Sequence, residues 1–144
     1  MATMADSATD ASAGQAETLD QVERRQNHPL YLHNSDTPGS VLTAVQLTGP
    51  KNYSLWSRSM LINLRAKSKL EFVLGTCRRC DYRGEMEEQW EKFNAFVLAW
   101  IMNTVSKELL SGIIYATDVA AVWADLKNAT IFLTKIRKHK RHHL

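Results

Sequence analysis

Residues 85–105 read EMEEQWEKFNAFVLAWIMNTV, and apolar side chains recur along them in steps of three and four. This period places the apolar residues on one face of an α-helix. Glu85, Glu87, Glu88 and Glu91 gather near its start, where the helix dipole favours negative charge. We therefore predict a helix over residues 85–105. Its apolar face consists of Met86, Trp90, Phe93, Val97, Trp100, Ile101 and Thr104.

A second amphipathic segment lies upstream. Asn52 is a suitable N-cap, and the apolar residues that follow it share one helical face. Further along, a short apolar cluster over residues 70–74 is ended by Gly75, and residues 76–84 are polar and loop-like. The sequence thus predicts a helix that starts after Asn52. Its face consists of Tyr53, Trp56, Met60, Leu61 and Leu64.

Two further helices are predicted downstream. Ser106 is expected to start a short helix over residues 107–115, and Thr117 is a suitable cap for the next one. In that last helix Val119, Val122, Trp123 and Leu126 occupy positions i, i+3, i+4 and i+7. Residues 131–133 extend the apolar pattern before a basic end.

All four tryptophans lie on these predicted faces, so we interpret them as core residues. Replacement of a buried Trp by Ala typically costs about 3–5 kcal/mol. The sequence therefore predicts an all-α fold, a small bundle of about four to five helices. The expected core and motif residues are Tyr31, Leu32, Tyr53, Trp56, Met60, Leu64, Trp90, Val97, Trp100, Trp123 and Leu126.

The rest of the chain flanks this bundle. Residues 1–26 carry almost nothing bulky to bury, and such a composition predicts a disordered tail. The domain is expected over residues 27–134. It begins with a short extended segment in which Asp36-Thr37-Pro38-Gly39 predicts a turn. Val41, Val45 and Leu47 are candidates for an extended piece with imperfect alternation.

Positive charge is concentrated in a tail over residues 135–144. Of the 18 basic residues, five lie there, and the remaining 13 face 15 acidic residues, a net charge of −2. The tail is a candidate nucleic-acid contact or nuclear import signal, and a basic end without a specific role is the alternative. Because no aromatic residue is interleaved with the cations, base stacking is not indicated. The five residues are Lys135, Arg137, Lys138, Lys140 and Arg141.

Chemistry-bearing patterns are scarce. Cys77 and Cys80 form a C-x-x-C pair, but a zinc site needs four ligands and these are the only cysteines. We interpret them as loop thiols, although the neighbouring Arg78 and Arg79 would lower a thiol pKa and keep reversible oxidation open. The histidines show no spacing typical of a nucleophile–base pair. We therefore expect no enzyme, no cofactor, no metal and no small-molecule substrate.

No export signal and no apolar run of membrane-spanning length is present. We expect no membrane partner. A cytoplasmic protein is the expectation, with a nuclear location through the basic tail as the alternative.

The N-terminal part of the domain carries a recognisable pattern. Residues 27–33 read Asn-His-Pro-Leu-Tyr-Leu-His, and Ser35-Asp36 and Pro38-Gly39 follow. They resemble the opening of the retrotransposon copia-like N-terminal domain, N-P-[LF]-Y-L-H-x-S-D-x-P-G, except that His28 separates the Asn from the Pro. The resemblance continues into a copia-type Gag pattern and covers about residues 27–127. It runs through Leu47-Thr48-Gly49, Asn52-Tyr53, Trp56-Ser57-Arg58-Ser59-Met60, Ala66-Lys67, Lys69-Leu70, Phe72-Val73, Gly75, Trp90, Asn94, Val97, Trp100-Ile101, Asn103, Val105-Ser106, Tyr115, Ala121, Val122-Trp123 and Asp125-Leu126.

This resemblance implies a helical Gag-type assembly protein that builds virus-like particles around element RNA, in a family common in plant genomes. Its expected partners are copies of itself or a Gag-like protein, and RNA. The family usually continues with Arg-Phe or Arg-Tyr after the Asp-Leu pair, whereas Lys127-Asn128 stands here. We therefore expect a truncated, non-enzymatic Gag-like fragment that self-associates. The alternative is a small, non-specific RNA- or DNA-binding protein that acts through the basic tail.

Overall fold

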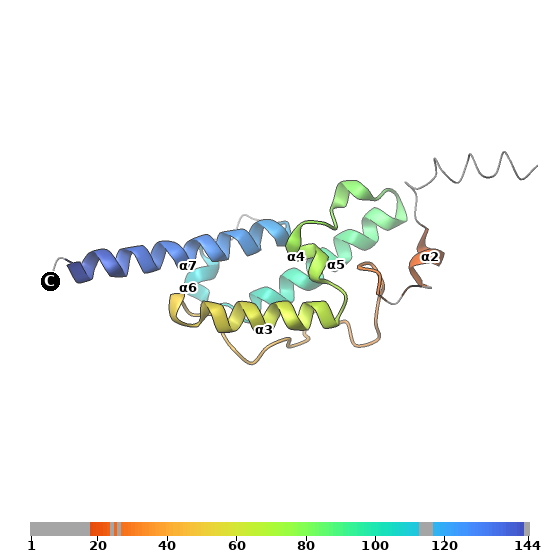
Figure 1. Ribbon diagram of the computed structural model, residues 1–144. Coiled ribbons are helices and arrows are strands. Elements are labelled where there is room, and N and C mark those ends of the chain that lie inside the picture. Colours follow the sequence, from red (N-terminus) through yellow and green to blue (C-terminus); the bar gives the residue numbers. More distant parts are fainter. Residues whose placement is uncertain (1–17, 24, 26, 113–116, 143–144) are drawn as a thin grey trace, which may run out of the picture.

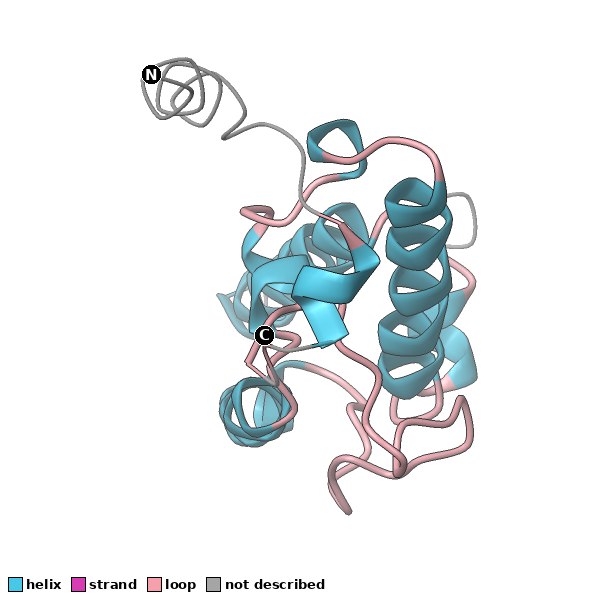
Figure 2. Cartoon of the chain, turned by 90° about the vertical axis from the view of Figure 1, so that its right-hand side faces the viewer, coloured by secondary structure: helices cyan, strands magenta, loops and turns pink. Residues whose placement is uncertain are grey.

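The computed structural model describes residues 18–23, 25, 27–112 and 117–142, and the side chains of Glu23 and of residues 131–142 lie outside this description. Within these residues the regular elements are helices, and the all-α class is confirmed (Figure 2). The α-helices are α2 (Leu19–Glu23), α3 (Tyr53–Ala66), α4 (Leu70–Leu74), α5 (Glu85–Met102), α6 (Lys107–Leu110) and α7 (Val119–His142). Two 3-10 turns, η1 (Pro50–Asn52) and η2 (Arg79–Asp81), accompany them.

Helices α3, α5 and α7 form the body of the molecule. Helix α7 runs back over α3 in the opposite direction (Figure 1), and Trp123 of α7 stacks on Trp56 of α3 with ring centroids 5.0 Å apart. Helix α5 contributes Trp100, Phe93 and Val97, which have no exposed surface. These contacts explain the bundle, because each helix buries the apolar face that its sequence period defines.

The helix boundaries follow the predicted periods closely, with local differences. Helix α5 ends at Met102 and α6 is shorter than predicted; residues 113–116 lie outside the described part. Before α7, the Asp118 side chain accepts a hydrogen bond from the Ala120 N–H (2.9 Å), so Asp118 caps the helix rather than the predicted Thr117. Asn52 precedes α3, but its side chain does not cap it. It bonds the Thr48 N–H and the Gln46 carbonyl instead.

Within the stretch up to residue 26, which the sequence predicts to be a disordered tail, the structure describes a short helix at residues 19–23. They form α2, in which Val22 is 2% exposed, and Leu19 packs against the core. A helix this short is stable here because tertiary contacts bury its two apolar residues. Residues 1–17 lie outside the described part of the chain.

The segment before α3 is a loop that follows the surface of the bundle. Instead of a strand it forms one isolated parallel bridge, between Leu47 and Val105. The Leu47 N–H donates to the Thr104 carbonyl (2.7 Å), and the Ser106 N–H donates to the Leu47 carbonyl (2.9 Å). The bridge ties the end of this loop to the end of α5.

Helix α7 continues through the expected basic tail. Its first half packs on the body, and its second half extends beyond it toward the C-terminus (Figure 1). The backbone of residues 135–142 is therefore helical. The side chains of the five candidate nucleic-acid residues lie outside the described part of the chain.

Candidate interaction surface

Three of the four tryptophans are both packed and hydrogen-bonded. Trp56, Trp90 and Trp100 are at most 6% exposed. Their indole N–H groups donate to the Thr104 hydroxyl (2.9 Å), the Cys77 carbonyl (2.9 Å) and the Thr37 carbonyl (2.6 Å), respectively. Since a buried indole N–H needs a partner, these rings are structural and do not line an open site.

The motif segment over residues 30–38 is held to the bundle through its backbone. Side chains of α5, of Asn103 just after it and of Lys69 just before α4 donate to its carbonyl groups. The donors and acceptors are Gln89 to Leu30 (3.2 Å), Lys69 to Tyr31 (2.9 Å), Trp100 to Thr37 (2.6 Å) and Asn103 to Pro38 (3.3 Å).

The same segment ends in the predicted turn. The Ser40 N–H donates to the Thr37 carbonyl (3.1 Å), which closes the turn around Pro38 and Gly39. Just before it, Asp36 is buried and pairs with the Lys67 ammonium group at 3.3 Å. Tyr31 is partly buried, but Leu32, which the sequence placed among the core residues, is 44% exposed. In an extended segment neighbouring side chains point to opposite sides, so only one of the pair reaches the core.

Lys69 is a buried lysine whose burial the sequence did not predict. It has no exposed surface, and its ammonium group lies 4.4 Å from the centre of the Phe93 ring. Burial lowers its pKa from 10.5 to about 8, while the nearby carboxylates of Asp36 and Glu71 oppose that shift. The expectation for a lysine is an exposed side chain, and no local pattern marks this one as different.

The cysteines do not form a reactive pair. Cys77 is buried, and burial raises the pKa of its thiol to about 11. The expected lowering by the flanking arginines is therefore wrong for Cys77. Those arginines have other partners: Arg78 pairs with Asp81, and Arg79 pairs with Glu87 (2.8 Å) and Glu91 (2.7 Å). Cys80 is exposed.

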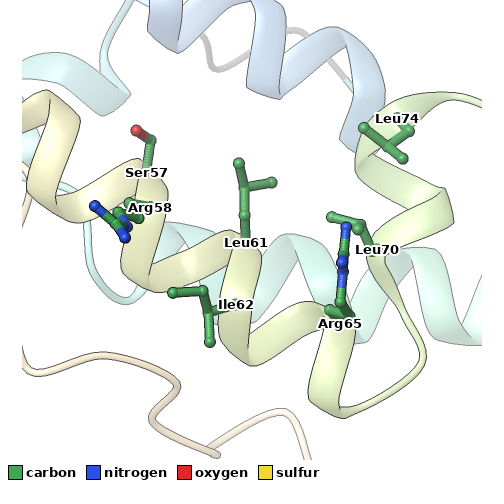
Figure 3. A pocket seen from close by; sticks show the side chains of 7 residues that line it. All are labelled: Ser57, Arg58, Leu61, Ile62, Arg65, Leu70 and Leu74. Carbon is green, nitrogen blue, oxygen red and sulfur yellow. The ribbon is translucent and has the colours of Figure 1, made fainter.

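Among the surface hollows of the described residues, two have linings without a carboxylate. The larger, with a volume of about 580 Å³, lies along α3 and α4 below α7, and we call it the α3–α4 groove (Figure 3). The smaller, about 110 Å³, is the Val41 hollow. It is lined entirely by uncharged residues: Val41, Thr43, Ala44, Val45, Gln46, Asn103 and Thr104.

Neither a metal site nor a membrane segment is evident in what the structure describes. Residues 18–23, 25, 27–112 and 117–142 contain no group of three or more His, Cys, Asp or Glu side chains placed to hold a metal ion. In the same part of the chain, no helix combines the length and apolar content that crossing a bilayer requires.

A known protein family matches one stretch of the chain. This stretch includes the turn around Pro38 and Gly39, α3 and α4, and the α3–α4 groove. Residues 33–79 match the Gag-polypeptide of LTR copia-type. This family match confirms the resemblance for that stretch and supports a Gag-like structural role for it. No curated protein and no solved structure matches the chain.

Proposed function

We propose that this chain is a Gag-like module that associates with copies of itself, as in the assembly of particles by a copia-type element. The supporting observation is the Val41 hollow. Val41 is 78% exposed beside it, and its lining carries no charge. A neutral hollow with a projecting apolar side chain suits self-pairing, because a two-fold axis brings identical residues together without repulsion.

The contact would be modest for one pair of molecules. Burial of an exposed Val contributes about 1.5–3 kcal/mol, so the Val41 hollow favours a weak, concentration-dependent association. Leu55 and Met102, which are 61% and 39% exposed, offer further apolar area. Weak contacts of this kind are sufficient when many copies are concentrated in one assembly.

Light scattering coupled to size exclusion tests the proposal on the full chain. The monomer mass is 16.4 kDa, and we expect the apparent mass to rise with protein concentration. The V41D variant should keep the mass at the monomer value, because a carboxylate in a neutral interface is desolvated without a partner. The I62D variant, a change of the same kind at an exposed residue of α3 that does not line the Val41 hollow, serves as the matched control. A strict monomer at millimolar concentration would reject self-association.

A second function is favoured by the basic half of α7. Residues 135–142 continue the helix away from the body and include five Lys and Arg residues. We propose non-specific RNA binding by this half-helix. Neutralisation of single-stranded phosphates by five cations predicts a slope of log K against log salt of about −3.5.

Fluorescence anisotropy with a labelled 20-nucleotide single-stranded RNA tests this second function. A chain that ends at residue 134 should lose the binding and its salt dependence. A K51A/R83A variant removes two exposed charges elsewhere and should change the salt slope much less. Equal affinity and equal slope with and without residues 135–144 would refute binding through α7.

A further inference from the structure

The α3–α4 groove has apolar walls that nothing in the described chain covers. Leu61 and Leu70 lie within it, and Ile62 and Leu74 are 59% and 61% exposed along it. Figure 3 shows Leu70 and Leu74 at the α4 end and Leu61 on α3 between them and Arg58. Because burial of side chains this exposed removes apolar surface from water, an apolar occupant is favoured.

The groove is also positively charged. Arg58 and Arg65 line it, both are exposed, and neither forms an ion pair with a described residue. No Asp or Glu occurs over residues 50–70, so α3 carries no carboxylate of its own. The two arginines are seven positions apart, which corresponds to about 10.5 Å along a helix. Their spacing matches two carboxylates that lie two turns apart on a partner helix.

Two other occupants fit less well. A second copy related by a two-fold axis would bring Arg58 and Arg65 toward their own counterparts, and like charges in an interface are unfavourable. Single-stranded nucleic acid usually stacks its bases on aromatic side chains. No aromatic residue lines this groove.

We propose that the α3–α4 groove binds an acidic amphipathic helix of another protein, with its apolar residues against Leu61, Ile62 and Leu74 and its carboxylates on Arg58 and Arg65. This is the helix-in-groove mode, in which apolar residues at i, i+3, i+4 and i+7 are the anchors. The inference goes beyond self-association, which uses the uncharged Val41 hollow on a different part of the surface.

A designed peptide provides the probe. We would label a 16-residue helix with leucines at i, i+3, i+4 and i+7 and glutamates beside them, and titrate the full chain by fluorescence anisotropy. The matched probe has lysines in place of the glutamates. We expect the acidic peptide to bind at least tenfold more tightly than the basic one.

Variants assign the binding to the groove. The R58E/R65E variant should reverse the preference between the two peptides, whereas R83E, at an exposed arginine outside the groove, should not. L74S should weaken the acidic peptide at least fivefold. L55S removes an equally exposed leucine of α3 that does not line the groove and should leave the affinity unchanged. Circular dichroism of each variant verifies that the helices are kept.

Several outcomes would overturn the inference. They are equal affinity for both peptides, an R58E/R65E variant without effect, and a 20-nucleotide RNA that occupies the groove in place of the peptide. The peptide test is independent of self-association. If the chain stays monomeric but binds the acidic peptide selectively, the groove proposal stands and the proposal of self-association is rejected.

Discussion

Lys69 shows how one residue links the motif segment to the bundle. Its ammonium group donates to the carbonyls of Tyr31 (2.9 Å) and Lys67 (3.4 Å) and lies over the Phe93 ring. None of these partners is a carboxylate. Its contacts with carbonyls and a ring offset only part of the free-energy cost of removing the charged ammonium group from water. Burial therefore lowers the pKa of Lys69 to about 8.

The stability of the protein should therefore rise above pH 8. Between about 8 and 10.5 the unfolded state binds more protons at Lys69 than the folded state, so the free energy of unfolding increases with pH. The thiol of Cys77 acts in the opposite sense, between its usual pKa of 9.0 and its raised pKa of about 11. We expect a rise of about 1 kcal/mol from pH 8 to 9, a plateau to about pH 10.5, and a fall beyond it. Urea unfolding under reducing conditions measures this profile.

Two variants separate the contributions. In K69M the rise between pH 8 and 9 should disappear, and in C77A the rise should continue beyond pH 9. A K69M profile identical to that of the native chain would show that Lys69 does not titrate in the core. The burial of Lys69 could not be read from the sequence, because Tyr31 and Phe93 lie 38 and 24 positions away and no local period relates them.

At the scale of elements, periodicity was sufficient for the long helices and insufficient for the loops. The faces of α3, α5 and the first half of α7 follow directly from apolar spacing. In contrast, the course of residues 30–47 depends on hydrogen bonds that side chains far away in the sequence, such as Trp100 and Asn103, donate to its backbone carbonyls. Helix α2 was missed for a similar reason, since only Leu19 and Val22 distinguish it from the polar sequence around it. The α3–α4 groove was also not predictable, because it depends on how α4 turns away from α3.

The anchoring of the motif segment leads to a prediction at this scale. The W100F variant removes the N–H that donates to the Thr37 carbonyl and leaves space in a fully buried site. We expect a loss of about 2–3 kcal/mol in the free energy of unfolding. The amide of Ser40, which closes the turn on the same carbonyl, should exchange faster with solvent.

W123F is the matched control for this change. Trp123 is only partly buried, and a phenyl ring retains the stacking on Trp56, so the loss should be smaller than in W100F. If W123F is as destabilising as W100F, or if Ser40 keeps its protection in W100F, the indole of Trp100 does not anchor the segment.

At the scale of the whole molecule, one helical body presents two chemically different surfaces. The Val41 hollow is uncharged, whereas the α3–α4 groove combines leucines and isoleucine with two arginines that have no acidic partner among the described residues. The Val41 hollow lies between the loop before α3 and the end of α5, which the Leu47–Val105 bridge joins. That hollow therefore exists only if the loop and α5 fold together.

Hydrogen exchange on the full chain tests this cooperativity most directly. We predict that the amides of Leu47 and Ser106, which form the bridge, exchange as slowly as those in the middle of α3 and α5, because all open only in global unfolding. Exchange of the bridge amides orders of magnitude faster than that of α5, or a lack of protection throughout residues 52–126, would contradict a single folded interaction domain.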